Sequence, residues 1–300
     1  MANGIAIDRV NTLIRCKPLL GTVVSIHLSG ASPRAALLEV SQLAFSAIDS
    51  VHRALNFHAP DSELSKLNSA SGRWCDASAA LIEVLSCALS ISAQSDGVFD
   101  VCTNMISSTK SRTTPAPSWR DIELDIERKS VRLHRSAKID LGGIAKGYAV
   151  DCAVDVLQRF FDTASESVQA ATLDQQPHFS VNAGGDLRLS DWRNQMTHVR
   201  VPNSEALIAV PMQNAAFASS SDEVRRRTID TQQQRLAHRS GHCYSVFAAR
   251  CMHADALTKV LRLHPAPHAV LAHFFATGLV IRASNVESES NVQHATLACA

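Results

Sequence analysis

The stretch from Lys138 to Asp151 constrains this chain more than any other, with the sequence Lys-Ile-Asp-Leu-Gly-Gly-Ile-Ala-Lys-Gly-Tyr-Ala-Val-Asp. A short strand runs into Gly142 and Gly143, and a helix is expected immediately afterwards. Glycines let backbone N–H groups approach a ligand, and a helix N-terminus adds partial positive charge. Because Lys146 adds a mobile full charge, the stretch is suited to cradle a pyrophosphate, although it matches neither a Walker A nor a Rossmann motif. On these residues alone, a tight turn with an exposed lysine explains the pattern equally well.

Two further segments have the composition of binding sites. Ser180–Asp186 is a predicted strand that ends in Asn-Ala-Gly-Gly-Asp, where small side chains leave room for a planar group. The alternative is an ordinary hairpin turn, since Gly-Gly permits positive φ. Asp255 stands at the start of a predicted helix, where an acid either ligates a cation or, more commonly, caps the helix.

Composition excludes several classes of protein. The 300 residues carry a formal net charge of +1, which gives no electrostatic reason to expect nucleic acid or an anionic membrane as a partner. The eight cysteines form no C-x-x-C pair and suggest no disulfide framework. No apolar window is long enough for a membrane-spanning segment, and residues 1–9 lack the apolar core of a signal peptide. We therefore expect a cytoplasmic protein, or a periplasmic one if the start of the chain is misassigned.

The periodicity of apolar residues predicts an α+β fold. Strands outnumber long helices and do not alternate regularly with them, which disfavours a doubly wound sheet. The predicted helices are 34–55, 78–95 with Ser78 as the cap, 144–161 and 254–263. The predicted strands are 22–28 after a turn that begins at 17, 122–125 paired with 131–134, 178–181, 244–248, 278–281 and several short ones within 187–213. We expect loops or connectors at 61–68, 103–118 and 222–242, and a frayed tail at 285–300.

Three segments in this order resemble the signature of the ApbE family of flavin transferases: Lys138–Asp151, Asn182–Asp186 and Ala254–Leu257. Weaker similarities to the family lie at Leu20–Thr22, Asp61–Asn68, Gly97–Asp100 and Phe217–Asp222. They extend over about residues 19–282, so the chain is identified as a divergent member with a single domain over 1–300. The resemblance implies a strand-rich fold with packed helices and an FAD cleft between two subregions.

The resemblance also implies an activity and its site. The expected enzyme is an FAD:protein FMN transferase that uses Mg²⁺, moves FMN from FAD to a protein threonine and releases AMP. The acceptor would be a flavoprotein with a Ser/Thr flavinylation motif. Lys146 would contact FAD during catalysis, and Mg²⁺ would be held by the Gly143 carbonyl and the Asp255 carboxylate. The other expected FAD contacts are Asn56, Phe57, Asp100, Asn182, Gly184, Gly185, Asp186, Ser219 and Ser220.

Two departures from the family pattern affect the chemistry. The family usually has a threonine or another small residue four positions after the metal-binding aspartate, and this chain has Lys259. Four residues are about one helical turn, so we hypothesise that the Lys259 ammonium neutralises Asp255 and partly replaces Mg²⁺. The second departure is at the family's histidine, which is replaced by Gln234, and His238 is the candidate for a displaced base.

These departures keep two alternatives open. One is a non-catalytic FAD-binding protein, and the other is an FAD pyrophosphatase that yields FMN and AMP.

Overall fold

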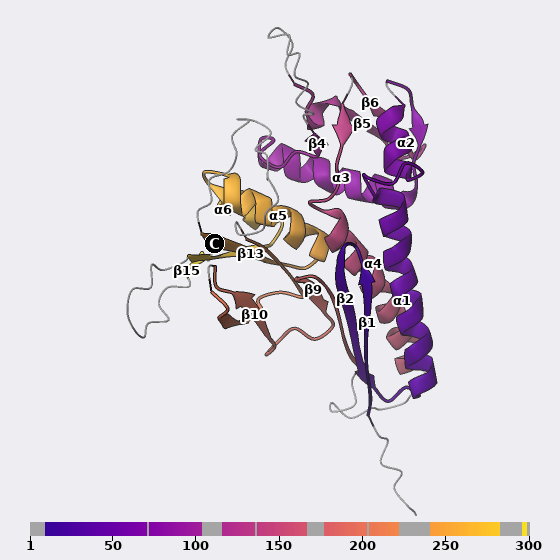
Figure 1. Ribbon diagram of the computed structural model, residues 1–300, viewed down its shortest axis with the longest axis vertical. Coiled ribbons are helices and arrows are strands. Elements are labelled where there is room, and N and C mark those ends of the chain that lie inside the picture. The colour runs from indigo at the N-terminus through magenta and orange to yellow at the C-terminus, as the bar shows by residue number, and fades with distance from the viewer. Residues whose placement is uncertain are drawn as a thin grey trace, which may run out of the picture.

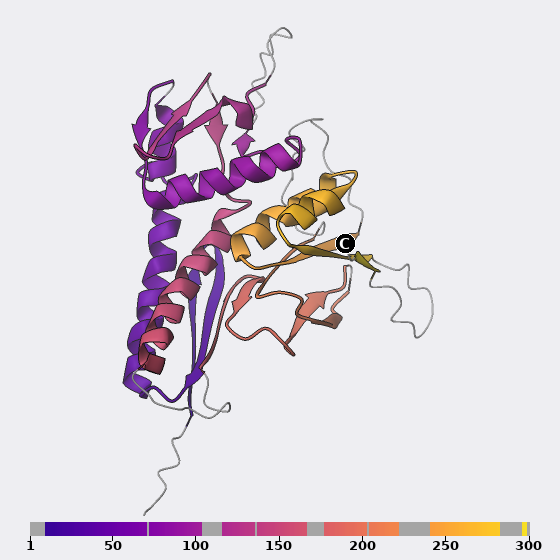
Figure 2. The same cartoon turned by 180° about the vertical axis from the view of Figure 1, so that it is seen from behind.

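The computed structural model describes residues 10–70, 72–103, 116–135, 137–166, 177–202, 204–221, 241–282 and 296–298. Among them, eight strands form one sheet in the order β1-β2-β8-β9-β12-β13-β14-β15 (Figures 1 and 2). Every neighbouring pair is antiparallel. The strands are β1 (Asn11–Leu19), β2 (Thr22–Gly30), β8 (His178–Ala183), β9 (Asp186–Leu189), β12 (Ala216–Ser221), β13 (His242–Ala248), β14 (Thr277–Arg282) and β15 (Thr296–Ala298).

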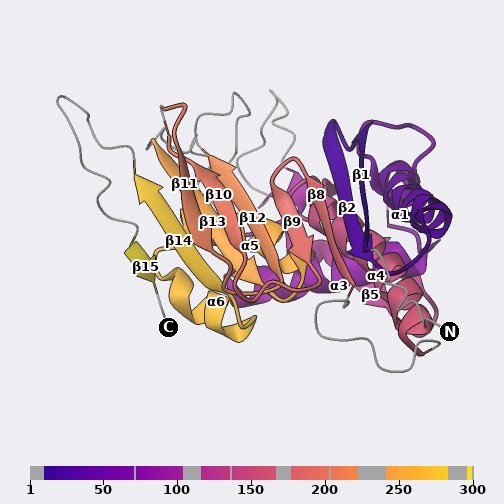
Figure 3. The same cartoon turned by 90° about the horizontal axis from the view of Figure 1, so that it is seen from below.

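Helices cover one face of this sheet, and a two-stranded hairpin lies over the other (Figure 3). The hairpin consists of β10 (Met196–Arg200) and β11 (Leu207–Pro211). The helices are α1 (Arg34–Leu55), α2 (Glu63–Ser69), α3 (Ala79–Gln94), α4 (Ala145–Glu166), α5 (Cys251–Leu263) and α6 (Pro267–His273). Two short sheets and a 3₁₀ turn pack beside α2 and α3: β3 (Cys75–Asp76), β6 (Ser130–Leu133) and β5 (Ile122–Asp125); β4 (Cys102–Thr103) and β7 (Lys138–Ile139); and Trp119–Asp121.

The main core lies between the sheet and its helices. On α1, Leu37, Val40, Ala44 and Ile48 are spaced by three or four residues and are all buried. This spacing gives the helix one apolar stripe, which packs against β1 and α4. A second core on the opposite face is closed by the β10–β11 hairpin and contains Val199, Val210, Met212, Phe217, Cys243, Phe247, Leu279 and Ile281.

The α+β prediction is confirmed, and several elements match closely. α1 has the predicted bounds, and Ser78 caps α3, since its hydroxyl oxygen accepts a hydrogen bond from the Leu81 amide. The predicted hairpin appears as β5 and β6. α4 ends at Glu166, five residues beyond the predicted end. None of the seven cysteines in the described part of the chain forms a disulfide.

Two predictions were wrong. Residues 17–19 belong to strand β1, and the turn is confined to Leu20 and Gly21, which have positive φ. The segment 61–68 is largely helical as α2, because Ser62 caps it and two of its leucines are buried. Most of the expected loops at 103–118 and 222–242, and of the tail at 285–300, lie outside the described residues, although residues 296–298 pair with β14. No described helix is long and apolar enough to cross a membrane.

Candidate functional site

Four charged residues meet at the point where α4, β9 and α5 converge. Lys146, in the first turn of α4, donates a hydrogen bond from Nζ to Oδ2 of Asp186 at the start of β9. Its Nζ is also 3.9 Å from Oδ2 of Asp255 in α5. Lys259, one turn further along α5, donates to Oδ1 of Asp255 and, at 2.8 Å, to the backbone carbonyl oxygen of the same residue. These two lysines and two aspartates are called the charge cluster below.

The acids of the charge cluster are buried, and the side chains of its two lysines are partly exposed. The side chains of Asp186 and Asp255 are 3% and 2% exposed, whereas those of Lys146 and Lys259 are 35% and 25% exposed. The exposed part of the cluster therefore comes from the two lysine side chains, although its formal charges sum to zero. This arrangement favours an anionic ligand at the surface of the cluster.

The pKa values of the two buried acids shift in opposite directions. Burial and the neighbouring Asp255 carboxylate raise the pKa of Asp186 to about 6, against the opposing effect of the lysines. Burial also acts to raise the pKa of Asp255, but Lys146 and Lys259 outweigh it and hold that pKa below its ordinary value. For Lys146, burial opposes the charge, and the carboxylates of Asp255 and Asp186 raise the pKa above its usual range. The lysine consequently stays charged at neutral pH.

The position of α5 depends on a buried acid that sequence reasoning did not single out. The carboxylate of Asp151 on α4 accepts hydrogen bonds from the backbone amides of Cys251 at 2.9 Å and Met252 at 3.0 Å. It therefore caps a helix whose own N-cap residue, Arg250, makes no side-chain cap bond. Arg188 on β9 donates to the same carboxylate at 2.8 Å. Asp151 is the last residue of the Lys138–Asp151 stretch. The sequence signal that could have singled it out is an acidic residue at the end of a run of apolar residues.

Close packing of α4 against α5 sets where Asp255 lies. Gly147 approaches the first turn of α5 so closely that a Cβ there would be 2.3 Å from the Cys251 carbonyl oxygen. The Gly147 amide lies 3.3 Å from Oδ2 of Asp255, to which it donates. Because α5 begins at Cys251, Asp255 is in its second turn, and the helix-cap interpretation of Asp255 is wrong.

The Gly142–Gly143 turn is fixed from both sides. The Gly142 amide donates to Oδ1 of Asp140 at 2.8 Å. Asn68 of α2 holds the preceding strand through two bonds to Ile139, accepting from its amide at 2.7 Å and donating to its carbonyl at 2.9 Å. A Cβ built on Gly143 would be 3.5 Å from Cε of Lys259, so the stem of that lysine lies directly beside the turn.

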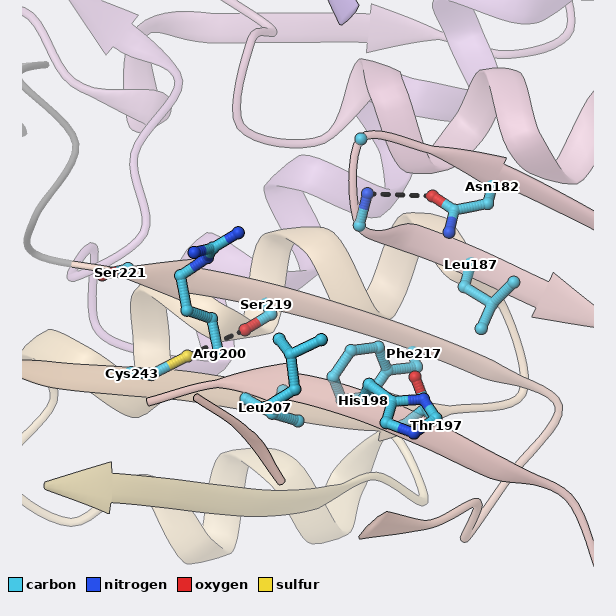
Figure 4. A pocket seen from close by; sticks show the side chains of 13 residues that line it. Asn182, Leu187, Thr197, His198, Arg200, Leu207, Phe217, Ser219, Ser221 and Cys243 are labelled. Carbon is cyan, nitrogen blue, oxygen red and sulfur yellow. Dashed lines mark hydrogen bonds between the residues drawn. The ribbon is translucent and has the colours of Figure 1, made fainter. Parts of the chain in front are cut away.

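A pocket of about 390 Å³ opens on the hairpin side of the sheet (Figure 4). It lies between the β10–β11 hairpin and strands β8, β9, β12 and β13 of the main sheet, and the β8–β9 turn forms part of its wall. In that turn, Gly184 and Gly185 have positive φ, and Oδ1 of Asn182 accepts from the Gly185 amide at 2.9 Å. The lining residues are Asn182, Gly184, Gly185, Leu187, Thr197, His198, Val199, Arg200, Leu207, Phe217, Ser219, Ser221 and Cys243.

The β8–β9 turn connects the pocket with the charge cluster. Gly185 lines the pocket, and the next residue, Asp186, belongs to the cluster on the helical face. Side chains along β12 alternate between the two faces of the sheet in the same way. Ser219 lines the pocket, whereas Ser220 points to the opposite face. The Gly-Gly-Asp segment is thus a hairpin turn and also part of the wall of the pocket.

The structure brings the predicted site residues into two groups. Lys146, Asp186 and Asp255 form the charge cluster with Gly143 beside it, and Asn182, Gly184, Gly185 and Ser219 line the pocket. The polar residues of β10, Thr197, His198 and Arg200, were missed because short strands in 187–213 carry no motif.

Four predicted residues belong to neither group: Asn56, Phe57, Asp100 and Ser220. Asn56 ends α1, and its Oδ1 accepts from the amide of His58 at 2.9 Å, while the ring of Phe57 contacts that of His58. The carboxylate of Asp100 accepts from the backbone amides of Cys102 at 2.8 Å and Trp119 at 3.1 Å.

The proposed base, His238, and Gln234 lie outside the described residues.

The oxygen atoms around Asp255 are already engaged. Its Oδ1 and backbone carbonyl bind Lys259, and its Oδ2 faces the Gly147 amide and Lys146. Within the described part of the chain, no group of three or more His, Cys, Asp or Glu side chains is arranged to hold a metal ion. In this arrangement the donor set does not fit a divalent cation, which needs free oxygen ligands.

Comparisons with known proteins agree on one family. The model of the ApbE family matches residues 20–272. An FAD:protein FMN transferase from Chlamydia pneumoniae is 25% identical over 272 residues, covering 81% of this chain and 79% of the relative. The fold resembles the ApbE protein of Thermotoga maritima, with a TM-score of 0.70, 20% identity, and 90% of this chain and 94% of that chain covered. It also resembles the flavin transferase ApbE of Vibrio cholerae, with a TM-score of 0.68, 18% identity, and coverage of 92% and 95%.

Proposed function

We propose that this chain, which belongs to the ApbE family, binds FAD and transfers its FMN half to a threonine hydroxyl of an acceptor protein, with release of AMP. The observation that carries the proposal is the charge cluster, in which two partly exposed lysine side chains pair with buried carboxylates beside the Gly142–Gly143 turn. A pyrophosphate is a ligand that such a surface favours, because its negative charge meets fixed positive groups with little reorganisation. The Chlamydia relative, which bears the name of this activity, supports the same choice.

The reaction consists of one phosphoryl substitution. The hydroxyl oxygen of the acceptor bonds to the phosphorus of the FMN half, and the bond from that phosphorus to the bridging oxygen breaks. AMP leaves with the electron pair, and the hydroxyl proton passes to a base or to water. Negative charge grows on the leaving phosphate, and the Lys146 ammonium, kept charged by Asp186 and Asp255, is positioned to offset it. His238 remains the predicted base.

The pocket and the cluster divide the binding of FAD between them. A volume of about 390 Å³ suits one half of FAD, with the pyrophosphate extending past the β8–β9 turn to the charge cluster. The glycine backbone of that turn and Ser219 supply polar contacts on the pocket side. Asn56 and Phe57 remain the predicted contacts of the isoalloxazine, and Asp100 and Ser220 remain predicted FAD contacts.

The proposed reaction does not include the Mg²⁺ that the family resemblance predicts at Gly143 and Asp255. Because Lys259 engages the Asp255 carboxylate, we assign no step of the reaction to a metal ion.

Two experiments test the proposal. The first is co-expression with an acceptor that carries a Ser/Thr flavinylation motif, followed by in-gel flavin fluorescence, with an active ApbE relative as the positive control. Flavin bound covalently to the acceptor is expected, and its absence beside a fluorescent control would contradict the transferase.

The second experiment separates the alternatives. Chromatography after incubation with FAD alone distinguishes a pyrophosphatase, which yields FMN and AMP, from a non-catalytic binding protein, which returns FAD intact.

The matched variant pair is Lys146→Met with Lys146→Met/Asp186→Asn. The single change leaves a buried carboxylate short of a partner and costs stability, whereas the double change removes the Lys146–Asp186 ion pair as a unit. Loss of activity in the folded double variant then reports on the Lys146–Asp186 pair rather than on unfolding.

A further inference from the structure

We propose that Lys259 supplies, from within the chain, the positive charge that a divalent cation would otherwise place beside the pyrophosphate. Three features of the described residues lead to this conclusion: the contacts of Lys259, the space that its side chain fills and the charge balance of the cluster.

The contacts of Lys259 are those of a ligated cation. Its Nζ donates to Oδ1 of Asp255 and, at 2.8 Å, to the backbone carbonyl oxygen of the same residue. A carboxylate oxygen and a carbonyl oxygen are the donor types that hard cations take in proteins. The ammonium therefore engages oxygen atoms that a metal ion at Asp255 would need.

The side chain of Lys259 also fills the space beside the turn. Its Cε would be 3.5 Å from a Cβ on Gly143, and Cε2 of the Phe99 ring would be 3.6 Å from the same point. The resemblance places the second expected metal ligand, the Gly143 carbonyl, in this turn. The stem of Lys259 thus lies beside Gly143 while its ammonium bonds to Asp255.

The charge balance disfavours an additional cation. Asp186 and Asp255 are nearly fully buried, and Lys146 and Lys259 already neutralise them one for one. A divalent ion bound to Asp255 would stand close to two ammonium groups, and at such separations like charges repel strongly in a partly buried site. The side chain of Lys259 is 25% exposed, so solvent reaches part of it.

The role assigned to Lys259 depends on the proposed function only for the identity of the anion as FAD. Binding of Mg²⁺ to the ligand-free protein does not depend on that identity. Two separate measurements on the full chain therefore test the metal and the flavin independently.

The first measurement is a calorimetric titration of Mg²⁺ into wild type, Lys259→Thr and the control Lys17→Thr, which alters a lysine of edge strand β1. Wild type and Lys17→Thr are expected to give no saturable binding, and Lys259→Thr is expected to bind Mg²⁺ at least about tenfold more tightly than wild type. Stoichiometric Mg²⁺ binding by wild type would overturn the proposal, and so would a folded Lys259→Thr that binds no Mg²⁺.

The second measurement is the affinity for FAD by flavin fluorescence in EDTA and in MgCl₂. Wild type should bind FAD equally in both, whereas Lys259→Thr should lose at least about tenfold in EDTA and recover in MgCl₂. Lys259→Arg keeps the charge and should remain insensitive to EDTA, which provides a second variant if Lys259→Thr folds poorly. FAD binding by wild type that requires Mg²⁺ would overturn the role of Lys259 and leave the proposed function intact. Failure of wild type to bind FAD under either condition would contradict the proposed function, and the Mg²⁺ titration would still decide whether Lys259 replaces the metal.

Discussion

Replacement of Gly147 by alanine tests the close packing that sets the charge cluster. A Cβ at this position would lie 2.3 Å from the carbonyl oxygen of Cys251, 2.6 Å from its carbonyl carbon and 2.8 Å from Cα of Met252. All three are backbone atoms in the first turn of α5, so no change of rotamer relieves the contact. The two helices must instead separate by roughly 1 Å to restore normal carbon contacts. The separation would also lengthen the hydrogen bond from the Gly147 amide to Asp255.

The expected cost follows from two opposing effects. Overpacking of a core costs about 1–3 kcal/mol, and a rigid backbone obstacle puts Gly147→Ala at or beyond the upper end. Alanine regains about 1 kcal/mol of helix propensity over glycine. We therefore expect the free energy of unfolding to fall by about 2 kcal/mol, as measured by urea denaturation.

Gly143→Ala is the matched control for this prediction. Its added methyl would meet only side-chain atoms, Cε of Lys259 at 3.5 Å and Cε2 of Phe99 at 3.6 Å. Its effect on stability should stay below about 1 kcal/mol. A Gly147→Ala variant as stable as wild type would refute the conclusion that contact between α4 and α5 requires glycine.

Three further predictions concern other residues of the site. The pKa of Asp186 is raised to about 6 from 3.8, so the stability that its protonated form contributes is lost as pH rises through that window. Relative to Asp186→Asn, the free energy of unfolding of wild type in urea denaturation should fall by roughly 3 kcal/mol between pH 4 and pH 7, and a difference between the two proteins that does not change with pH would contradict the shift. Asp151→Ala should cost about 3 kcal/mol or more, because it removes the cap of α5 and leaves Arg188 without its carboxylate; thermal unfolding that matches wild type would argue against the cap. Gly184→Ala should cost about 1–3 kcal/mol, since φ is +65° and the new Cβ would lie 2.4 Å from Oγ1 of Thr22, and an unchanged denaturation midpoint would exclude this strain.

The parts of the fold that the sequence predicts well have strong local patterns. Helix α1 has an uninterrupted apolar stripe, and Ser78 is a clear cap before an apolar run, so both were placed correctly. Strand β1 was missed because it is an edge strand in which Arg15, Lys17 and Pro18 break the apolar alternation. α2 was assigned as a connector because its serines suggested a loop.

The candidate site also has parts that the sequence predicted and parts that it did not. Family membership and the α+β fold are confirmed, and spacing alone predicted that Lys259 would reach Asp255, as it does. Contacts between distant segments were not predictable: nothing local indicates that Asp151 caps a helix that begins a hundred residues later. The residues of β10 that line the pocket were missed for the same reason. They reach the pocket only because the β10–β11 hairpin folds back over the sheet.

Product analysis after incubation with FAD tests the central claim most directly. The protein is mixed with FAD and a flavinylation-motif acceptor, and AMP is quantified by chromatography while flavin on the acceptor is measured by fluorescence. The account predicts AMP release in step with covalent FMN on the acceptor, and the loss of both in Lys146→Met/Asp186→Asn. Recovery of intact FAD, with the flavin bound to the protein but no AMP formed, would contradict it.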